Sequence, residues 1–209
     1  MGLDYSYMLY FKRDSIWEVL KSIKDIAWEH DPPTRIHFPD HVLPIPFDIT
    51  SVKGKEFQYD DPELDFDTVL EVDWDEAIID YLHDSNTEDS HRSPPGHGQQ
   101  KKASIGMIYL HVYQEDPYQP MPDLVLFRFT AATTLMSILF DHSASIRCTF
   151  TGLLEKFNGV CGVLDRESGG GRLFWFHGKS YTIDIKDAYL TPDEIEDLLR
   201  TLNQRDENG

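Results

Sequence analysis

The stretch from Glu63 to Asp75 reads Glu-Leu-Asp-Phe-Asp-Thr-Val-Leu-Glu-Val-Asp-Trp-Asp, with acidic and apolar residues alternating along most of it. Successive residues of a β-strand point to opposite faces of the sheet, so this alternation predicts a half-buried strand. Its apolar face, which includes Leu64, Phe66 and Leu70, is expected in the core. Its other face carries carboxylates about 6.6–6.8 Å apart. These carboxylates are the candidate partner-binding residues Glu63, Asp65, Asp67, Glu71 and Asp73.

The acidic charge of the chain is concentrated around this strand. The formal net charge is −18, from 37 acidic and 19 basic residues, and 14 of the acids lie between Glu56 and His91, where there is no Lys or Arg. Such a region repels phosphate, which argues against direct binding to nucleic acid or to an anionic membrane. It favours a basic protein partner. A second interpretation is that the acids protect an edge strand against aggregation.

The remaining pattern predicts an α+β fold, with helices packed on a mostly antiparallel sheet. A strand at 5–11 is followed by a helix that begins with a capping box at Ser15 and Glu18 and has apolar positions as far as Ala27. Strands are then expected at 47–52, 56–59, 105–113 and 124–130, a helix at 75–83, and a hairpin of 160–164 with 172–176. The segment 133–140 fits either strand or helix. A strand at 181–185 precedes a final helix that begins with a capping box at Thr191 and Glu194.

Residues 85–104 interrupt every periodic pattern. The segment 85–103 is dominated by Ser, Pro, Gly and polar residues, so we predict a flexible loop or linker. It would separate an N-terminal half, 1–84, from a C-terminal half, 105–209, and we expect the two to form one composite domain. A strand-helix-strand-strand order on both sides of the linker would be compatible with ferredoxin-like units.

Three residues, His37, Asp40 and His41, are chemically competent metal ligands close together in the sequence. The two histidines have the i, i+4 spacing of a helical zinc pair, but Pro39 lies between them and disfavours the helix that would align them. The Glu that follows the first His of a zinc-protease motif is replaced by Phe38. We therefore assign no metal site and no cofactor from the sequence, and keep these residues as candidates only.

No linear motif of catalysis is present. A Gly-x-Ser-x-Gly elbow is missing, and the two cysteines, Cys148 and Cys161, give no disulfide framework. Without an apolar run long enough for a membrane span, the expected location is the cytoplasm. The sequence therefore favours a binding protein that engages a basic protein partner. The alternative is a hydrolase or transferase whose metal or acid-base site is assembled from separate loops.

Overall fold

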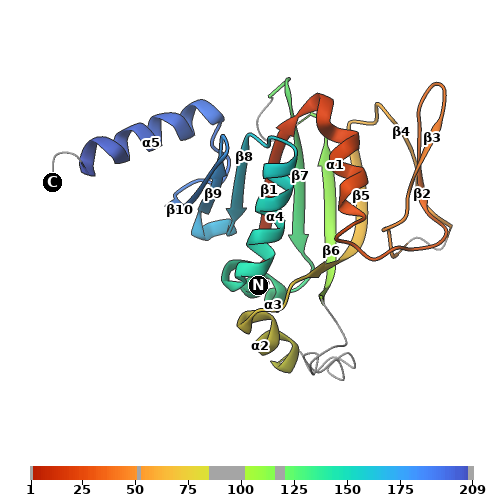
Figure 1. Ribbon diagram of the computed structural model, residues 1–209, viewed down its shortest axis with the longest axis horizontal. Helices are drawn as coiled ribbons and strands as arrows, with labels where there is room; N and C mark the ends of the chain where they lie inside the picture. The colour runs from red at the N-terminus through yellow and green to blue at the C-terminus, as the bar shows by residue number, and fades with distance from the viewer. Residues whose placement is uncertain (1, 51–52, 85–101, 116–120, 207–209) are drawn as a thin grey trace.

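A computed structural model describes residues 2–50, 53–84, 102–115 and 121–206 (Figure 1). Its main element is a seven-stranded sheet, antiparallel at every strand pair, in the order β10-β9-β8-β1-β7-β6-β5. The strands are β1 (Ser6–Lys12), β5 (Glu63–Val72), β6 (Ala103–Tyr113), β7 (Leu124–Ala131), β8 (Cys161–Asp165), β9 (Gly171–Phe176) and β10 (Lys179–Ile185). The predicted α+β fold with a mostly antiparallel sheet is confirmed.

The four central strands follow the ferredoxin-like order. Strands β8, β1, β7 and β6 are neighbours in this order. The connection from β1 to β6 contains α1 (Ile16–Ile23), and the connection from β7 to β8 contains α3 (Thr134–His142) and α4 (Ala144–Lys156). This is one β-α-β-β-α-β arrangement. It takes its strands from both predicted halves of the chain, and a strand-helix-strand-strand order occurs on each side of residues 85–101.

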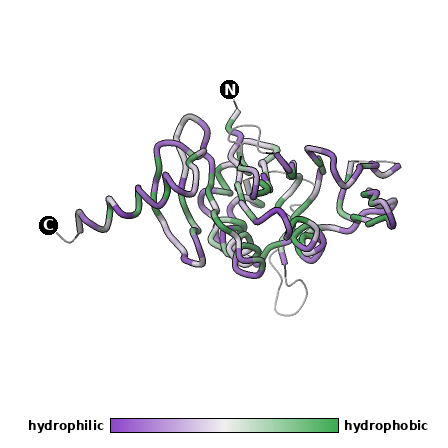
Figure 2. Tube along the Cα trace, turned by 90° about the horizontal axis from the view of Figure 1, so that it is seen from above, coloured by the Kyte–Doolittle hydropathy of each residue, from purple (hydrophilic) through white to green (hydrophobic). Residues whose placement is uncertain are grey.

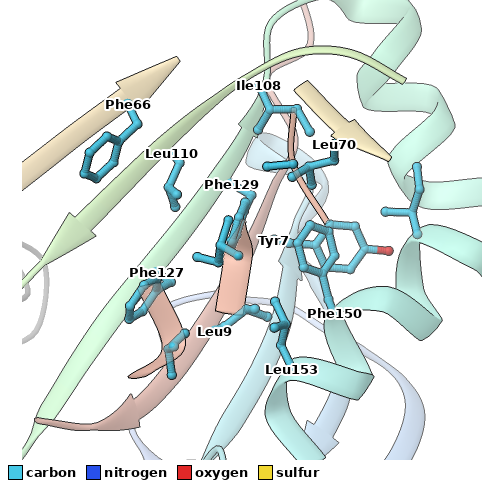
Figure 3. Packing of buried hydrophobic residues seen from close by; sticks show 14 of the residues in the cluster. Tyr7, Leu9, Phe66, Leu70, Ile108, Leu110, Phe127, Phe129, Phe150 and Leu153 are labelled. Atoms are coloured by element: carbon cyan, nitrogen blue, oxygen red, sulfur yellow. The ribbon is translucent and has the colours of Figure 1, made fainter. Parts of the chain in front are cut away.

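The main core lies between one face of the sheet and the helices α1, α3 and α4. Tyr7 and Phe129 on the inward face of the sheet meet Phe150 of α4, and all three are almost fully buried (Figure 3). The Tyr7 ring packs against Phe150 at 4.4 Å between centroids, and its hydroxyl donates to the backbone carbonyl of Phe140 at 2.9 Å. The buried Tyr7 hydroxyl is thereby satisfied, as a polar group in a core has to be.

Among the described residues, the cover on the opposite face of the sheet extends from β10 across β8 and β1 to Leu126 of β7. There a second core cluster forms between Met8, Val163 and Leu173 and the start of α5 (Pro192–Asp206). The α5 helix then runs outward from the body of the molecule, as both views show (Figures 1 and 2). Over β5 and β6 this second face carries no helix among the described residues, and we call it the helix-free face.

A smaller sheet lies beyond β5, at the far end from β10 (Figure 1). It contains β3 (Val42–Ile45), β2 (Thr34–His37) and β4 (Glu56–Gln58), with β2 in the middle, antiparallel to β3 and parallel to β4. The remaining helix, α2 (Glu76–Asp84), follows β5. Its Asp75 cap accepts from the Ile78 amide at 2.9 Å.

Several local predictions need correction. The capping box at Ser15 and Glu18 does not form: Ser15 ends a 3-10 turn without a side-chain cap, and α1 ends at Ile23 rather than near Ala27. No strand forms at residues 47–50 of the predicted strand 47–52, whose last two residues lie outside the described part of the chain. The nearest strand is β3, whose four residues include Pro44. The linker 85–104 lies outside the described residues as far as residue 101, and Ala103 and Ser104 already belong to β6.

Candidate acidic binding surface

Strand β5 presents three of its carboxylates side by side on the helix-free face. Its burial alternates as predicted at this end: Leu64 and Phe66 are buried, whereas the side chains of Glu63, Asp65 and Asp67 are 46%, 53% and 23% exposed. The alternation arises because the inward residues face α1 and the small sheet, while the outward ones lie on the helix-free face, where Lys55 contacts Asp65 and the Thr50 hydroxyl donates to Asp67. Three acids therefore share one open surface.

The neighbouring strand β6 adds a row of aromatic rings beside these acids. In the antiparallel register Glu63 lies opposite Tyr113, Asp65 opposite His111, and Asp67 opposite Tyr109. Such directly opposed side chains are about 4.5–5.5 Å apart at Cβ. Tyr109 is 37% exposed, and the rings of His111 and Tyr113 stack with centroids 5.8 Å apart. We call this two-row array the acidic surface; it consists of Glu63, Asp65, Asp67, Tyr109, His111 and Tyr113.

The other two predicted residues lie apart from this group. A register shift between Val69 and Glu71 interrupts the strand, and Glu71 accepts a hydrogen bond from the Trp28 indole at 2.9 Å. Asp73 follows the end of β5 and is exposed. The structure therefore brings together three of the five carboxylates that the sequence singled out. It adds the β6 ring row, which sequence reasoning missed although Met-Ile-Tyr-Leu-His-Val-Tyr at 107–113 alternates in the same way.

One lysine partly neutralises the acidic surface. The Lys55 ammonium lies 3.0 Å from Asp65 Oδ2, 3.4 Å from Asp48 Oδ2 and 4.0 Å from Asp67 Oδ2. Burial works against the charge of Lys55, but the hydrogen bond to Asp65 and the three carboxylates outweigh it and raise the pKa of the ammonium. Lys55 therefore stays protonated, and it joins the small sheet to β5.

Arg128, on the strand next to β6, pairs with Asp165. Arg128 of β7 lies opposite His111, but its guanidinium contacts the buried Asp165 at 3.6 Å and donates to Ser6 Oγ at 3.2 Å. Asp165 also accepts from the Tyr189 hydroxyl at 3.0 Å. This network ties the segment before α5 to the sheet, and its charges are paired with each other. The acidic surface beside it keeps its negative excess.

The outer edge of β5 is already covered by the chain itself. The carbonyls of Asp67 and Val69 accept from the backbone amides of Ile49 and Trp28, and the Glu71 amide donates to Ile26. The Asp65 carbonyl accepts from Lys55 Nζ at 3.0 Å. An added strand would find these groups occupied. Charges at positions 65 to 71 are therefore not required to keep another strand away.

The metal candidates of the small sheet are paired with different carboxylates. His37 Nε2 bonds to Glu56 and His41 Nδ1 to Asp40 at 2.8 Å, and the His41 ring stacks on Phe38. The hydrogen bond from His41 lowers the pKa of Asp40. Within the described residues no group of three or more His, Cys, Asp and Glu side chains is placed to hold a metal ion. Each of the two histidines is therefore hydrogen-bonded to its own carboxylate.

The resolved pKa shifts among carboxylates all favour the charged form. A hydrogen bond from His37 lowers the pKa of Glu56, and one from Arg172 lowers that of Asp184. For Asp75, burial raises the pKa, but hydrogen bonds from Ser143, Ser145 and Ile78 outweigh it. Burial raises the pKa of the Cys161 thiol. A general acid or base at neutral pH needs a pKa shifted towards neutrality, and these shifts run the other way.

The fold and the surface define an α+β protein with a carboxylate and aromatic array on an open sheet face. Comparison with protein-family models, with curated proteins and with solved structures found no match to this chain. None of the helices in the described part of the chain combines the length and the apolar character that a membrane crossing requires.

Proposed function

We propose that this chain is a binding protein whose acidic surface receives a basic protein partner. The observation that carries the proposal is the cross-strand register, which places three carboxylates directly beside three rings on an open face. The Glu63 carboxylate is hydrogen-bonded to the His111 ring at 2.8 Å, and Asp65 pairs with the Lys55 ammonium at 3.0 Å, so the surface already binds a cation of its own chain.

The chemistry of the surface suits arginine side chains in particular. A guanidinium can form two parallel hydrogen bonds to one carboxylate and can stack on an aromatic face. Tyr109, which is 37% exposed, supplies such a face within one strand spacing of Asp67, whereas the Tyr113 ring already stacks on His111. A lysine ammonium gains the charge attraction but loses the planar stacking. The partner is therefore expected to present arginines.

The covered edge of β5 supports this proposal over the edge-protection interpretation. The backbone carbonyls of Asp67 and Val69 already accept hydrogen bonds from backbone amides, and that of Asp65 accepts one from Lys55. Like charges on one strand face are mildly destabilising. A cluster that costs stability and protects no open edge has its best explanation in binding.

The test uses a defined probe, a peptide of six arginines, titrated into the full chain and followed by NMR chemical shifts. We expect the shifts to map to β5 and β6, with weaker binding at about 0.15 M than at about 0.01 M salt. The triple variant Glu63→Gln, Asp65→Asn, Asp67→Asn should weaken binding by roughly 3- to 150-fold, because three exposed ion pairs at about 0.2–1 kcal/mol each contribute about 0.6–3 kcal/mol.

A matched variant removes the same number of charges elsewhere. Glu76→Gln, Asp80→Asn and Glu196→Gln change three exposed acids outside the acidic surface. This control should keep both the affinity and the salt dependence of the original chain. If both triple variants weaken binding equally, only the net charge matters and the acidic surface is not a site. A peptide of six lysines should bind more weakly than the arginine peptide.

The alternative of a hydrolase or transferase gains no support from carboxylates whose pKa values are lowered by their hydrogen bonds. We also propose a cytoplasmic location, supported by two free cysteines, exposed Cys148 and buried Cys161.

A further inference from the structure

A cavity of about 320 Å³ lies between α1 and the segment that contains β3. Leu20 of α1 lines it, together with all five residues from Leu43 to Phe47. Leu20, Ile45 and Phe47 are buried, so the deep part of the lining is apolar. Small-molecule sites in proteins have mainly apolar walls and volumes of about 300–1,000 Å³. This cavity falls at the small end of that range.

The wall at residues 43–47 is held in place by its neighbours. Strand β3 pairs with β2 along its whole length, and the Pro46 carbonyl accepts a hydrogen bond from the His30 amide. The Phe47 ring packs against Phe66 in the main core, with centroids 5.3 Å apart. These contacts shape the cavity before any ligand binds, which lowers the entropy cost of binding.

The charged part of the cavity lining is cationic. Among the described residues that line the cavity, Lys21 and Lys24 are the charged ones, and both are exposed. In a chain with 37 acids and 19 bases, a lining with two lysines and no acid favours an anion. Lys21 also pairs with Glu18 at 3.0 Å, whereas Lys24 forms no ion pair with the described part of the chain. The positive excess is therefore close to one charge, which suits a monoanion.

The same wall disfavours an extended peptide as the occupant. Strand β3 is an edge strand of the small sheet, and Pro44 and Pro46 occupy alternate positions along this segment. Proline has no amide hydrogen, and it is tolerated on an edge strand where that amide would face away from the neighbouring strand. An added strand would therefore find no donor at these two positions. A small apolar molecule requires none.

We propose that this cavity binds a small monocarboxylate with an apolar tail of about ten carbon atoms. The size follows from the volume: an apolar cavity of about 150 Å³ accepts benzene, so about twice this volume holds roughly ten to twelve carbons. The carboxylate then lies at Lys21 and Lys24, and the tail lies between Leu20 and residues 43–47. The proposal is independent of the function proposed for the acidic surface.

The experiment titrates decanoate, a monocarboxylate of this size, into the full chain and follows backbone amide chemical shifts by NMR. We expect shift changes at Leu20, Lys24, Leu43, Ile45 and Phe47, with a dissociation constant below about 1 mM. Two probes with the same tail test the charge. Decanol should bind at least about 2-fold more weakly because it lacks the negative charge. Decyltrimethylammonium should bind more weakly still, because its charge is repelled by the lysines.

Variants separate the charged head from the tail. Lys21→Gln with Lys24→Gln should weaken decanoate binding by roughly 2- to 30-fold and leave decanol binding unchanged. The control Lys179→Gln with Lys186→Gln removes two exposed lysines elsewhere and should leave both affinities unchanged. Leu43→Ala should weaken decanoate and decanol alike, by roughly 3- to 10-fold, because it removes part of the apolar wall.

The length of the tail tests the volume of the cavity. Hexanoate has four fewer methylene groups and should bind at least about 30-fold more weakly than decanoate. Affinity should stop rising beyond about twelve carbons, because further methylene groups stay in water. Equal binding of decanoate and decanol, or shift changes mainly elsewhere in the chain, would overturn the proposal. So would an affinity that keeps rising to about fourteen carbons, or no binding at about 1 mM decanoate.

Discussion

Lys55 is the residue whose removal tests most directly how the small sheet and the acidic surface are held together. Its ammonium contacts Asp65 and Asp48, and the Asp48 side chain is only 1% exposed. Asp48 also accepts from Thr34 at 3.4 Å. We consider Lys55→Met, which keeps the aliphatic length of the side chain and removes its charge.

The expected loss of stability follows from the burial of the two groups. Leaving one partner of a buried ion pair alone costs about 3–5 kcal/mol. The Lys55 side chain is 27% exposed, and water can partly replace it, so the full figure does not apply. An exposed pair such as that with Asp65 contributes about 0.2–1 kcal/mol. We expect the free energy of unfolding to fall by roughly 2–3 kcal/mol.

The assay is urea denaturation followed by tryptophan fluorescence, with a double-mutant cycle through Asp48→Asn. If the cost arises from the unpaired carboxylate, the double variant should recover at least about 1 kcal/mol relative to the sum of the single changes. The same Lys55→Met variant should bind the six-arginine peptide more tightly, because it removes a competing cation. A loss below about 0.5 kcal/mol, or strictly additive costs, would refute the reasoning.

Two further predictions concern the core and the pH dependence. Phe66→Ala should lower the free energy of unfolding by about 3–5 kcal/mol, since Phe66 is 1% exposed and its ring packs 5.3 Å from Phe47 and 5.6 Å from Phe57; a loss under about 1 kcal/mol in urea denaturation would contradict the register of β5. Asp75 has a lowered pKa in the folded chain, so its stabilisation is present above the unfolded pKa of about 3.9 and is lost as pH falls through the folded value. The difference in unfolding free energy between the original chain and Asp75→Asn should therefore be constant from about pH 7 to 5 and shrink below about pH 4; a difference that grows on acidification would contradict the hydrogen bond from Ser145.

Local sequence signals predicted the elements whose stability depends on their own residues. The capping box at Thr191 and Glu194 forms as expected because its two side chains lie at the surface and each accepts a hydrogen bond from the backbone amide of the other residue. The box at Ser15 and Glu18 fails although its residues are equally suitable, since the chain leaves β1 through a 3-10 turn at Arg13–Ser15. The segment 133–140, which fitted strand or helix, becomes α3 with Thr133 as its cap.

Half of the candidate site was predictable from the sequence, and half was not. The alternation at 63–67 determined which residues of β5 face away from the core, because a strand has a fixed period of two. Which residues lie beside them depends on pairing with β6, a strand more than thirty residues further along the chain. The register that puts Tyr109 opposite Asp67 is set by that pairing. No local sequence pattern specifies this register.

The sequence by itself determined the fold class, the apolar and acidic faces of β5, and the concentration of charge in one region, because these follow from composition and periodicity. Only the tertiary structure decided that Lys55 lies among three carboxylates, that Glu71 accepts a hydrogen bond from Trp28, and that segments of the chain cover the β5 edge of the sheet. These contacts join segments separated by up to dozens of residues. Their formation depends on how the whole chain closes around its core, and a local window of sequence cannot specify that.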